Sequence, residues 1–72
     1  MIPKMVPVVS SDLHSVGYDG FTGRLYISFN NGGLYEYDSV PHVVYEQLLQ
    51  AGSHGKYFHS YIKGRYAYRR VG

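Results

Sequence analysis

The sequence has no cysteine and no tryptophan among its 72 residues. Without cysteine, disulfide bonds and thiolate metal sites are excluded. A chain of this length buries only about 60% of the surface that it exposes when unfolded, so its core alone gives marginal stability. Good packing and self-association are the supports that remain. Nine tyrosines and three phenylalanines fit a core built from aromatic rings, which bury much area for few rotatable bonds.

Long apolar runs are also missing. No stretch approaches the roughly 18 consecutive apolar residues that a membrane helix needs. The first residues, MIPKMVPVVSS, include one lysine and two prolines but no continuous apolar segment, which does not fit a secretory signal. We therefore expect a cytoplasmic protein that has no membrane partner.

Acidic residues are absent after Glu46, and this gives the chain an uneven charge. Through Ser53, two basic residues stand against five acidic ones, a balance of −3, whereas His54 to Gly72 carries +5; the sum is the net charge of +2. Such asymmetry indicates an anionic partner. The alternative is a charged face that only keeps the protein in solution.

Turn residues and hydrophobic alternation divide the chain into short elements. Residues 1–10 are expected to form an extended N-terminal arm, because Pro3 and Pro7 keep the residues before them out of helix. Residues 11–72 are expected to form a single domain. Residues 12–18 suggest a short strand, and RLYISF (24–29) alternates apolar and polar positions as a half-buried strand does.

The segment NNGG (30–33) predicts a hairpin turn whose length decides which side chains are buried. A two-residue turn would set Ile27 opposite Glu36. A three-residue loop that ends on Gly33, with positive φ there, would set Phe29 opposite Tyr35 and Ile27 opposite Tyr37. The longer loop is favoured, because it keeps Glu36 off the apolar face.

Two helices and a final strand follow. Pro41 suits the first turn of a helix that Gly52 can close in a left-handed conformation. Ser53 offers an N-cap for a short second helix, which Gly64 would end. RYAYRRV (65–71) alternates again. The predicted order is β-β-β-α-α-β, an α+β fold: a small antiparallel sheet with one longer and one short helix packed on one face.

An ordered set of short motifs resembles the KTSC domain family. The matching pieces are SVGYD (15–19), RLYISF (24–29), GGLYEY (32–37), VP (40–41) ahead of VYEQLLQA (44–51), S-x-G-x-Y-F (53–58) and IKGRYAY (62–68). The chain departs from the family pattern at His59 and Ala67. The resemblance implies a domain found at the C-terminus of some lysyl-tRNA synthetases and as small bacterial and phage proteins. Its link to RNA rests on the synthetase context.

Several chemistries are excluded by spacing. AGSHGKY (51–57) is not a phosphate-binding loop, because only two residues separate Gly52 from Gly55. The four histidines show no helical i, i+4 pair that would hold zinc, so no metal is expected. All five carboxylates precede residue 47 and no serine lies in a nucleophile elbow, so we expect no enzyme activity and no cofactor.

The candidate site is therefore a ligand-binding surface in the basic end of the chain. Backbone N–H groups at the start of the second helix, with Ser53 and Lys56, would hold a phosphate. Cations would neutralise charge while Tyr66 or Tyr68 stacks a base. The full set is Ser53, Lys56, His59, Lys63, Arg65, Tyr66, Tyr68, Arg69 and Arg70.

These residues predict a small non-enzymatic binding module for a phosphate-bearing ligand: RNA, a nucleotide or a cyclic (oligo)nucleotide messenger, with sequestration as one way to act. The alternative is a protein–protein interaction or self-assembling adaptor with no nucleotide ligand, in which the last tyrosines complete the core. In either case the small core predicts a homo-oligomer.

Overall fold

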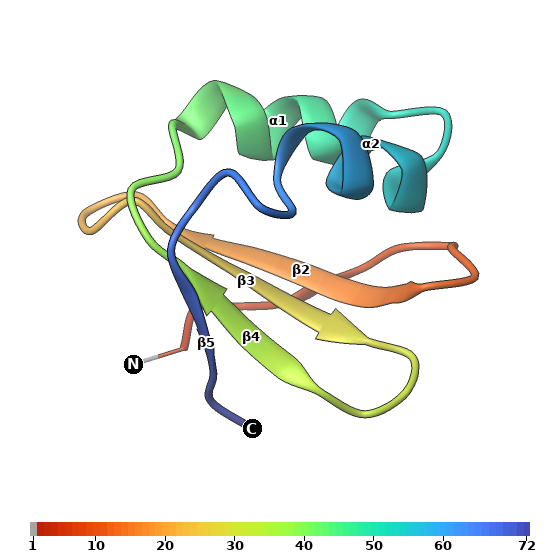
Figure 1. Cartoon of the computed structure of the whole chain (residues 1–72), viewed down its shortest axis with the longest axis horizontal. Coiled ribbons are helices and arrows are strands. Elements are labelled where there is room, and N and C mark those ends of the chain that lie inside the picture. Colours follow the sequence, from red (N-terminus) through yellow and green to blue (C-terminus); the bar gives the residue numbers. More distant parts are fainter. Residues whose placement is uncertain (1) are drawn as a thin grey trace.

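The computed structural model describes residues 2–72 as a two-layer α+β fold (Figure 1). One layer is a five-stranded antiparallel sheet in the order β1-β2-β3-β4-β5. Both helices cover one face of it, as predicted (Figure 1). The elements are β1 (Val6–Pro7), β2 (Leu13–Asp19), β3 (Arg24–Phe29), β4 (Leu34–Tyr37), α1 (His42–Gln50), α2 (His54–Tyr61) and β5 (Tyr68–Arg70). In this described part of the chain, neither helix has the length and hydropathy to cross a membrane.

The sheet is a meander into which the two helices are inserted. Strands β2, β3 and β4 follow one another through short turns, and the chain then forms α1 and α2 before β5 pairs with β4 at one edge. The two-residue strand β1 forms the other edge and lies within the arm that the sequence predicts as merely extended. The observed order is thus β-β-β-β-α-α-β, one strand more than predicted.

The core lies between the sheet and the helices. Leu25 and Ile27 of β3 are fully buried, and alternate residues of the neighbouring strands face the same way. Leu48, Phe58 and Ile62 complete the core from the helical layer. The alternation in RLYISF therefore predicts the buried face of β3 correctly.

The turn between β3 and β4 differs in detail from the prediction. The loop has three residues, but it spans residues 30–32 and is closed by a hydrogen bond from the Phe29 N–H to the Gly33 carbonyl at 2.8 Å. The positive φ is at Gly32 (102°), so the prediction of positive φ at Gly33 is wrong. Gly33 is needed for space instead, because a Cβ there would lie 2.8 Å from Cε1 of Tyr35.

The register is consequently two residues from the predicted one. Ile27 pairs with Tyr35, and Leu25 pairs with Tyr37. Because side chains alternate with a period of two, this shift leaves every residue on its predicted face. Tyr37 is buried under the helices as expected.

The joint between the helices also differs. Gly52 has no positive φ, so the predicted left-handed cap is wrong. The chain leaves α1 through Ala51 in an extended conformation, and the ring Nδ1 of His54 lies 2.8 Å from the Leu48 carbonyl, which satisfies that group at the helix end. Ser53 is the N-cap of α2, as predicted; the helix ends at Tyr61 with Ile62 as its C-cap, before Gly64, which has φ of 78°.

Candidate ligand-binding site

The predicted site residues of β5 lie on two opposite faces of the sheet. Tyr68 pairs with Tyr37 and Arg70 pairs with Tyr35, so both side chains are on the face that the helices cover. Arg69 pairs with Glu36 and is on the other face. The strand therefore does not present its arginines as one continuous cationic surface.

Arg69 is engaged in a polar network around Glu36, whose side chain is only 7% exposed. Its Nη2 lies 2.6 Å from Oε1 of Glu36, and the hydroxyl of Tyr26 donates to Oε2 at 2.6 Å. No donor, Arg69 included, is aligned for a hydrogen bond to Oε1, so Arg69 stabilises this oxygen through its charge. The Tyr26 hydrogen bond and the nearby arginines together lower the pKa of Glu36, against the effect of burial. Arg69 therefore stabilises the fold by compensating the buried charge of Glu36.

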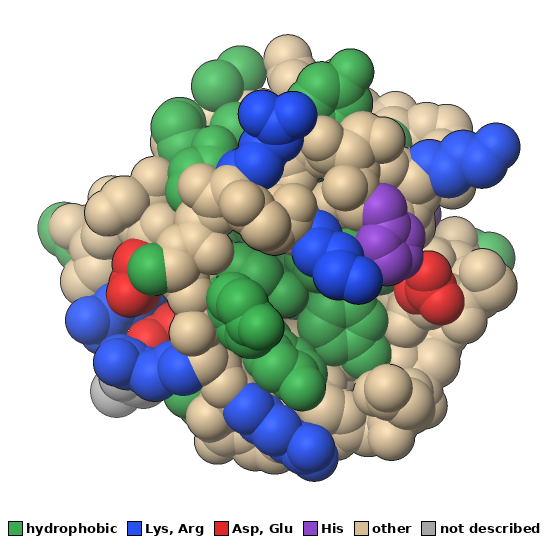
Figure 2. Space-filling model, in the orientation of Figure 1, with side chains coloured by type: hydrophobic (Ala, Val, Ile, Leu, Met, Phe, Trp, Pro, Cys, Tyr) green, Lys and Arg blue, Asp and Glu red, His purple; other side chains and the backbone are tan. Residues whose placement is uncertain are grey.

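A groove of about 470 Å³ opens on the helix-covered side of the sheet, beside α2 (Figure 2). Figure 2 shows its apolar floor, bordered by basic side chains, a histidine and an acidic side chain. Its lining combines rings, charges and an amide: Asp12, Phe29, Asn31, Tyr35, Tyr37, Phe58, His59, Lys63, Gly64 and Tyr68.

Five aromatic side chains in this lining, Phe29, Tyr35, Tyr37, Phe58 and Tyr68, contact one another in a closed circuit, which we call the aromatic cluster. Going round it in the order 29, 35, 68, 37, 58 and back to 29, successive ring centroids lie 5.6, 6.0, 5.7, 5.7 and 5.3 Å apart. Phe58 is 3% exposed whereas Tyr68 is 61% exposed. The cluster is anchored in the core and offers an open ring at the groove.

The rim of the groove carries the charges. Lys63 and His59 line it from the helical layer. Nε2 of His59 lies 3.1 Å from Oδ2 of Asp12, whereas Lys63 has no ion-pair partner among residues 2–72. Lys63 is therefore the cation that remains available to an anion in the groove.

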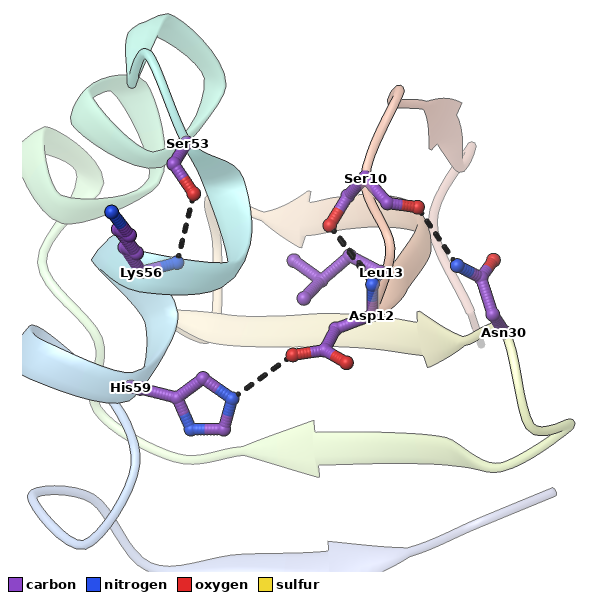
Figure 3. Close-up of polar contacts among 7 residues, drawn as sticks. All are labelled: Ser10, Asp12, Leu13, Asn30, Ser53, Lys56 and His59. Carbon is purple, nitrogen blue, oxygen red and sulfur yellow. Dashed lines mark hydrogen bonds and ion pairs between the residues drawn. The ribbon is translucent and has the colours of Figure 1, made fainter.

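A smaller hollow of about 290 Å³ lies at the start of α2 and includes Ser53, Lys56 and His59. The hydroxyl of Ser53 accepts from the Lys56 N–H at 3.3 Å as a helix cap (Figure 3). The carboxylate of Asp12 also lines this hollow, and its Oδ2 would lie 3.5 Å from a Cβ at Gly55. Because Asp12 lines both cavities, its charge does not distinguish them; the aromatic cluster lines only the groove, which makes the groove the better candidate for a ligand with an aromatic ring.

The structure brings together part of the predicted set. His59, Lys63 and Tyr68 line the groove, and Ser53 and Lys56 line the second hollow. Arg65 donates to the Ser60 carbonyl, Tyr66 packs half-buried against the core, and Arg70 donates to the Gly72 carbonyl. With Arg69, these residues line neither cavity.

Several groove residues were missed from the sequence. The predicted hairpin puts Phe29, Tyr35 and Tyr37 on its apolar face, which agrees with their packing against the core but does not predict that, with Phe58, they line a groove. Asp12 and Asn31 carried no signal, because both lie in turns distant in sequence from the basic end. Among residues 2–72, no three His, Asp or Glu side chains gather as metal ligands would.

Comparison with known proteins agrees with this fold. The KTSC domain model matches residues 9–66. A crystal structure of a KTSC domain protein from Yersinia pestis superposes with a TM-score of 0.94 at 36% identity, covering 96% of this chain and 97% of that one.

Sequence relatives extend the comparison. An uncharacterized protein of Stutzerimonas stutzeri is 41% identical over 69 residues, covering 94% of this chain and 97% of that protein. A lysine–tRNA ligase of Trichormus variabilis is 43% identical over 54 residues, which are 75% of this chain but 10% of that enzyme. The chain thus spans about a tenth of the ligase that it matches, and it belongs to the KTSC domain family.

Proposed function

We propose that this protein is a non-enzymatic binding module for a ligand that combines an aromatic base with phosphate, such as a nucleotide, a cyclic (oligo)nucleotide or a nucleotide of an RNA chain. The observation that carries the proposal is the groove in which the aromatic cluster lies beside the unpaired Lys63. Stacking of a base on an aromatic side chain contributes about 1–3 kcal/mol and tolerates any base, because every base has a π-face.

The two parts of such a ligand match two parts of the groove. The exposed ring of Tyr68 stacks at 5.7 Å on Tyr37, so its orientation is supported from beneath. Lys63 and His59 lie on the rim, where a phosphate can approach them from solvent. An apolar floor with a few polar groups on its border is the usual form of a small-molecule site.

The proposal involves binding without chemistry. Among the described residues that line the groove there is no serine, threonine or cysteine to act as a nucleophile beside the Asp12–His59 pair. A module that binds a nucleotide and does not alter it acts by holding it, which is sequestration, or by presenting it to a larger assembly. The lysine–tRNA ligases among its relatives are compatible with an RNA ligand that the module presents to a larger assembly.

Titration of the protein with AMP, GMP, a cyclic dinucleotide and a short single-stranded RNA, at low and moderate salt, tests the proposal. We expect binding that weakens as salt rises, because phosphate contacts release counterions. Lys63→Ala should weaken it, whereas Lys4→Ala removes the same charge from the N-terminal arm and should not. If no ligand binds more tightly than about 100 μM at low salt, which is the weak end of non-specific binding, the proposal is wrong.

Self-assembly is a second candidate, favoured by the exposed edge of the sheet. All three residues of β5 are exposed, and Val71 next to them is 41% exposed. An unprotected edge strand is a template for pairing with another chain. An adaptor that assembles through this edge would need no nucleotide.

A further inference from the structure

Hydrogen bonds join the turn before β2 to the loop between β3 and β4, next to the groove. The hydroxyl of Ser10 accepts from the N–H groups of Asp12 and Leu13 at 3.1 and 3.2 Å (Figure 3). The Asn30 N–H donates to the Asp12 carbonyl at 2.8 Å, and the Asn30 side chain donates to the Ser10 carbonyl at 2.9 Å. These bonds hold Asp12 beside the loop that contains Asn31, so that both residues lie on one wall of the groove.

Asn31 presents a hydrogen-bond donor on this wall. Its Oδ1 accepts from the Gly33 N–H at 3.3 Å, which fixes the orientation of the amide. The two N–H donors of its Nδ2 have no protein acceptor among residues 2–72. Asn31 is therefore free to donate to an acceptor on a ligand.

Asp12 presents acceptors on the same wall. Its Oδ2 contacts the ring of His59 at 3.1 Å, but an ionised carboxylate has about four acceptor sites on its two oxygens. The side chain is 53% exposed, so it keeps acceptor capacity for a ligand. It also repels phosphate, so a phosphate-bearing ligand must turn another, donor-rich group towards this wall.

We propose that the groove selects guanine as the base. Asp12 would accept from the N1–H and the 2-amino group of guanine, and Asn31 would donate to its O6, while the ring lies on the aromatic cluster and the phosphate extends towards Lys63. This inference rests on the proposed function and adds the identity of the base.

The other bases do not offer the same edge. Adenine and cytosine place a ring acceptor beside their amino group, and that acceptor would face the carboxylate. Uracil has one N–H between two carbonyl oxygens. Guanine alone of the four has two adjacent donors, which match two carboxylate oxygens.

The base preference of the unaltered protein is the first measurement. GMP, IMP and AMP carry the same phosphate, and IMP lacks only the 2-amino group of GMP. A bidentate contact of this kind discriminates by about 1–3 kcal/mol, so GMP should bind roughly tenfold or more tightly than AMP, with IMP between them. A guanine-containing single-stranded RNA, titrated in parallel against an adenine-only RNA, shows whether the base is read as a free nucleotide or within a chain.

Asp12→Asn should reduce the preference for GMP over AMP to about threefold or less, because an amide has one acceptor oxygen where the carboxylate has two. Glu46→Gln is the matched control, since it removes an acidic charge at an exposed helix position and should keep the full preference. Equal binding of GMP and AMP by the unaltered protein, or an unchanged preference in Asp12→Asn, would overturn the guanine inference but leave the proposed function standing. If neither a free nucleotide nor single-stranded RNA binds, both are overturned.

Discussion

The guanidinium of Arg69 lies 2.6 Å from the buried carboxylate of Glu36, on the face of the sheet opposite the helices. The two residues are direct cross-strand neighbours on β5 and β4. Because side chains alternate along a strand, an Arg69 fixed on this face sets Tyr68 and Arg70 on the other. The ion pair therefore helps to place Tyr68 against the aromatic cluster.

Arg69→Ala should lower the free energy of unfolding by about 1–3 kcal/mol, because it leaves the buried carboxylate of Glu36 with less compensation. Arg24 stays near but contacts Oε1 only at 3.9 Å. Urea denaturation measures the change. Arg65→Ala is the matched control, because Arg65 is exposed and bonds only to a backbone carbonyl; it should cost less than about 0.5 kcal/mol. Equal effects of the two substitutions would contradict a structural role for the pair.

Glu36 should also make the fold sensitive to acid. Its folded-state pKa lies below the ordinary value of 4.5, chiefly because Tyr26 donates a hydrogen bond to the carboxylate. A lowered carboxyl pKa stabilises the fold fully above the unfolded pKa, and this contribution is lost as pH falls through the folded pKa. We expect Glu36→Gln to be less stable than the unaltered protein at pH 6 and the difference to shrink below about pH 4.5.

Urea denaturation at several pH values between 6 and 3 checks this behaviour. Glu46→Gln, at an exposed position of α1, controls for the loss of one carboxylate. A gap between the Glu36→Gln and unaltered curves that stays constant across the whole range would show that Glu36 does not stabilise the fold through its ionised form.

Ionisation of Tyr37 should destabilise the fold at alkaline pH. Burial, followed by the neighbouring Tyr68 and Tyr35, raises the pKa of Tyr37 from 10.0 to about 12. The folded state keeps this proton while the unfolded chain releases it, so stability is full below pH 10 and falls between pH 10 and 12. At about 1.4 kcal/mol per pH unit, the loss from this one group approaches 3 kcal/mol.

Tyr37→Phe isolates this contribution, because phenylalanine has no proton to lose there. The variant should lose less stability than the unaltered protein on going from pH 9 to pH 12, measured by thermal unfolding monitored by circular dichroism. Parallel loss of stability in the two proteins would show that the Tyr37 hydroxyl ionises as easily in the fold as in the unfolded chain.

The parts of the fold that depend on local chemistry could be predicted from the sequence. Alternation in residues 24–29 identified the buried face of β3, and Ser53 marks the start of α2 as expected. The hairpin shows the limit of such reasoning. Alternation fixes which face a side chain occupies, but a shift of two residues leaves the faces unchanged, so the pattern did not distinguish the two registers.

The groove depends on contacts that are distant in sequence. Asp12 meets His59 across 47 positions, and two helices separate β4 from the β5 residue that pairs with Glu36. Charge counting treated Arg69 as a free cation because the acidic partner lies outside the basic segment. The composition predicted a site made of aromatic rings and basic side chains. Which of these side chains lie together depends on how α2 and β5 pack against the sheet.

Self-association through β5 is the prediction that links stability to the proposed ligand. The strand is short and exposed at the sheet edge, and pairing it with a second copy would bury the side chain of Val71 beside it. Such pairing would also bring the arginines of two copies together. Their repulsion favours separate chains unless an anion lies between them, so phosphate-bearing ligands should promote assembly.

Analytical ultracentrifugation at micromolar concentrations, with and without GMP, is the test, and we expect a dimer or a larger closed assembly that GMP stabilises. Val71→Lys, which adds a charge at the exposed edge, should shift the protein towards an 8.2 kDa monomer. Val43→Lys makes the same change at an exposed position of α1 and should leave assembly unaltered. A strictly monomeric unaltered protein, even with GMP, would remove the assembly and leave the groove as a single-copy surface. If instead Val43→Lys dissociates the assembly and Val71→Lys does not, the copies meet through α1 and the ligand has no reason to strengthen their contact.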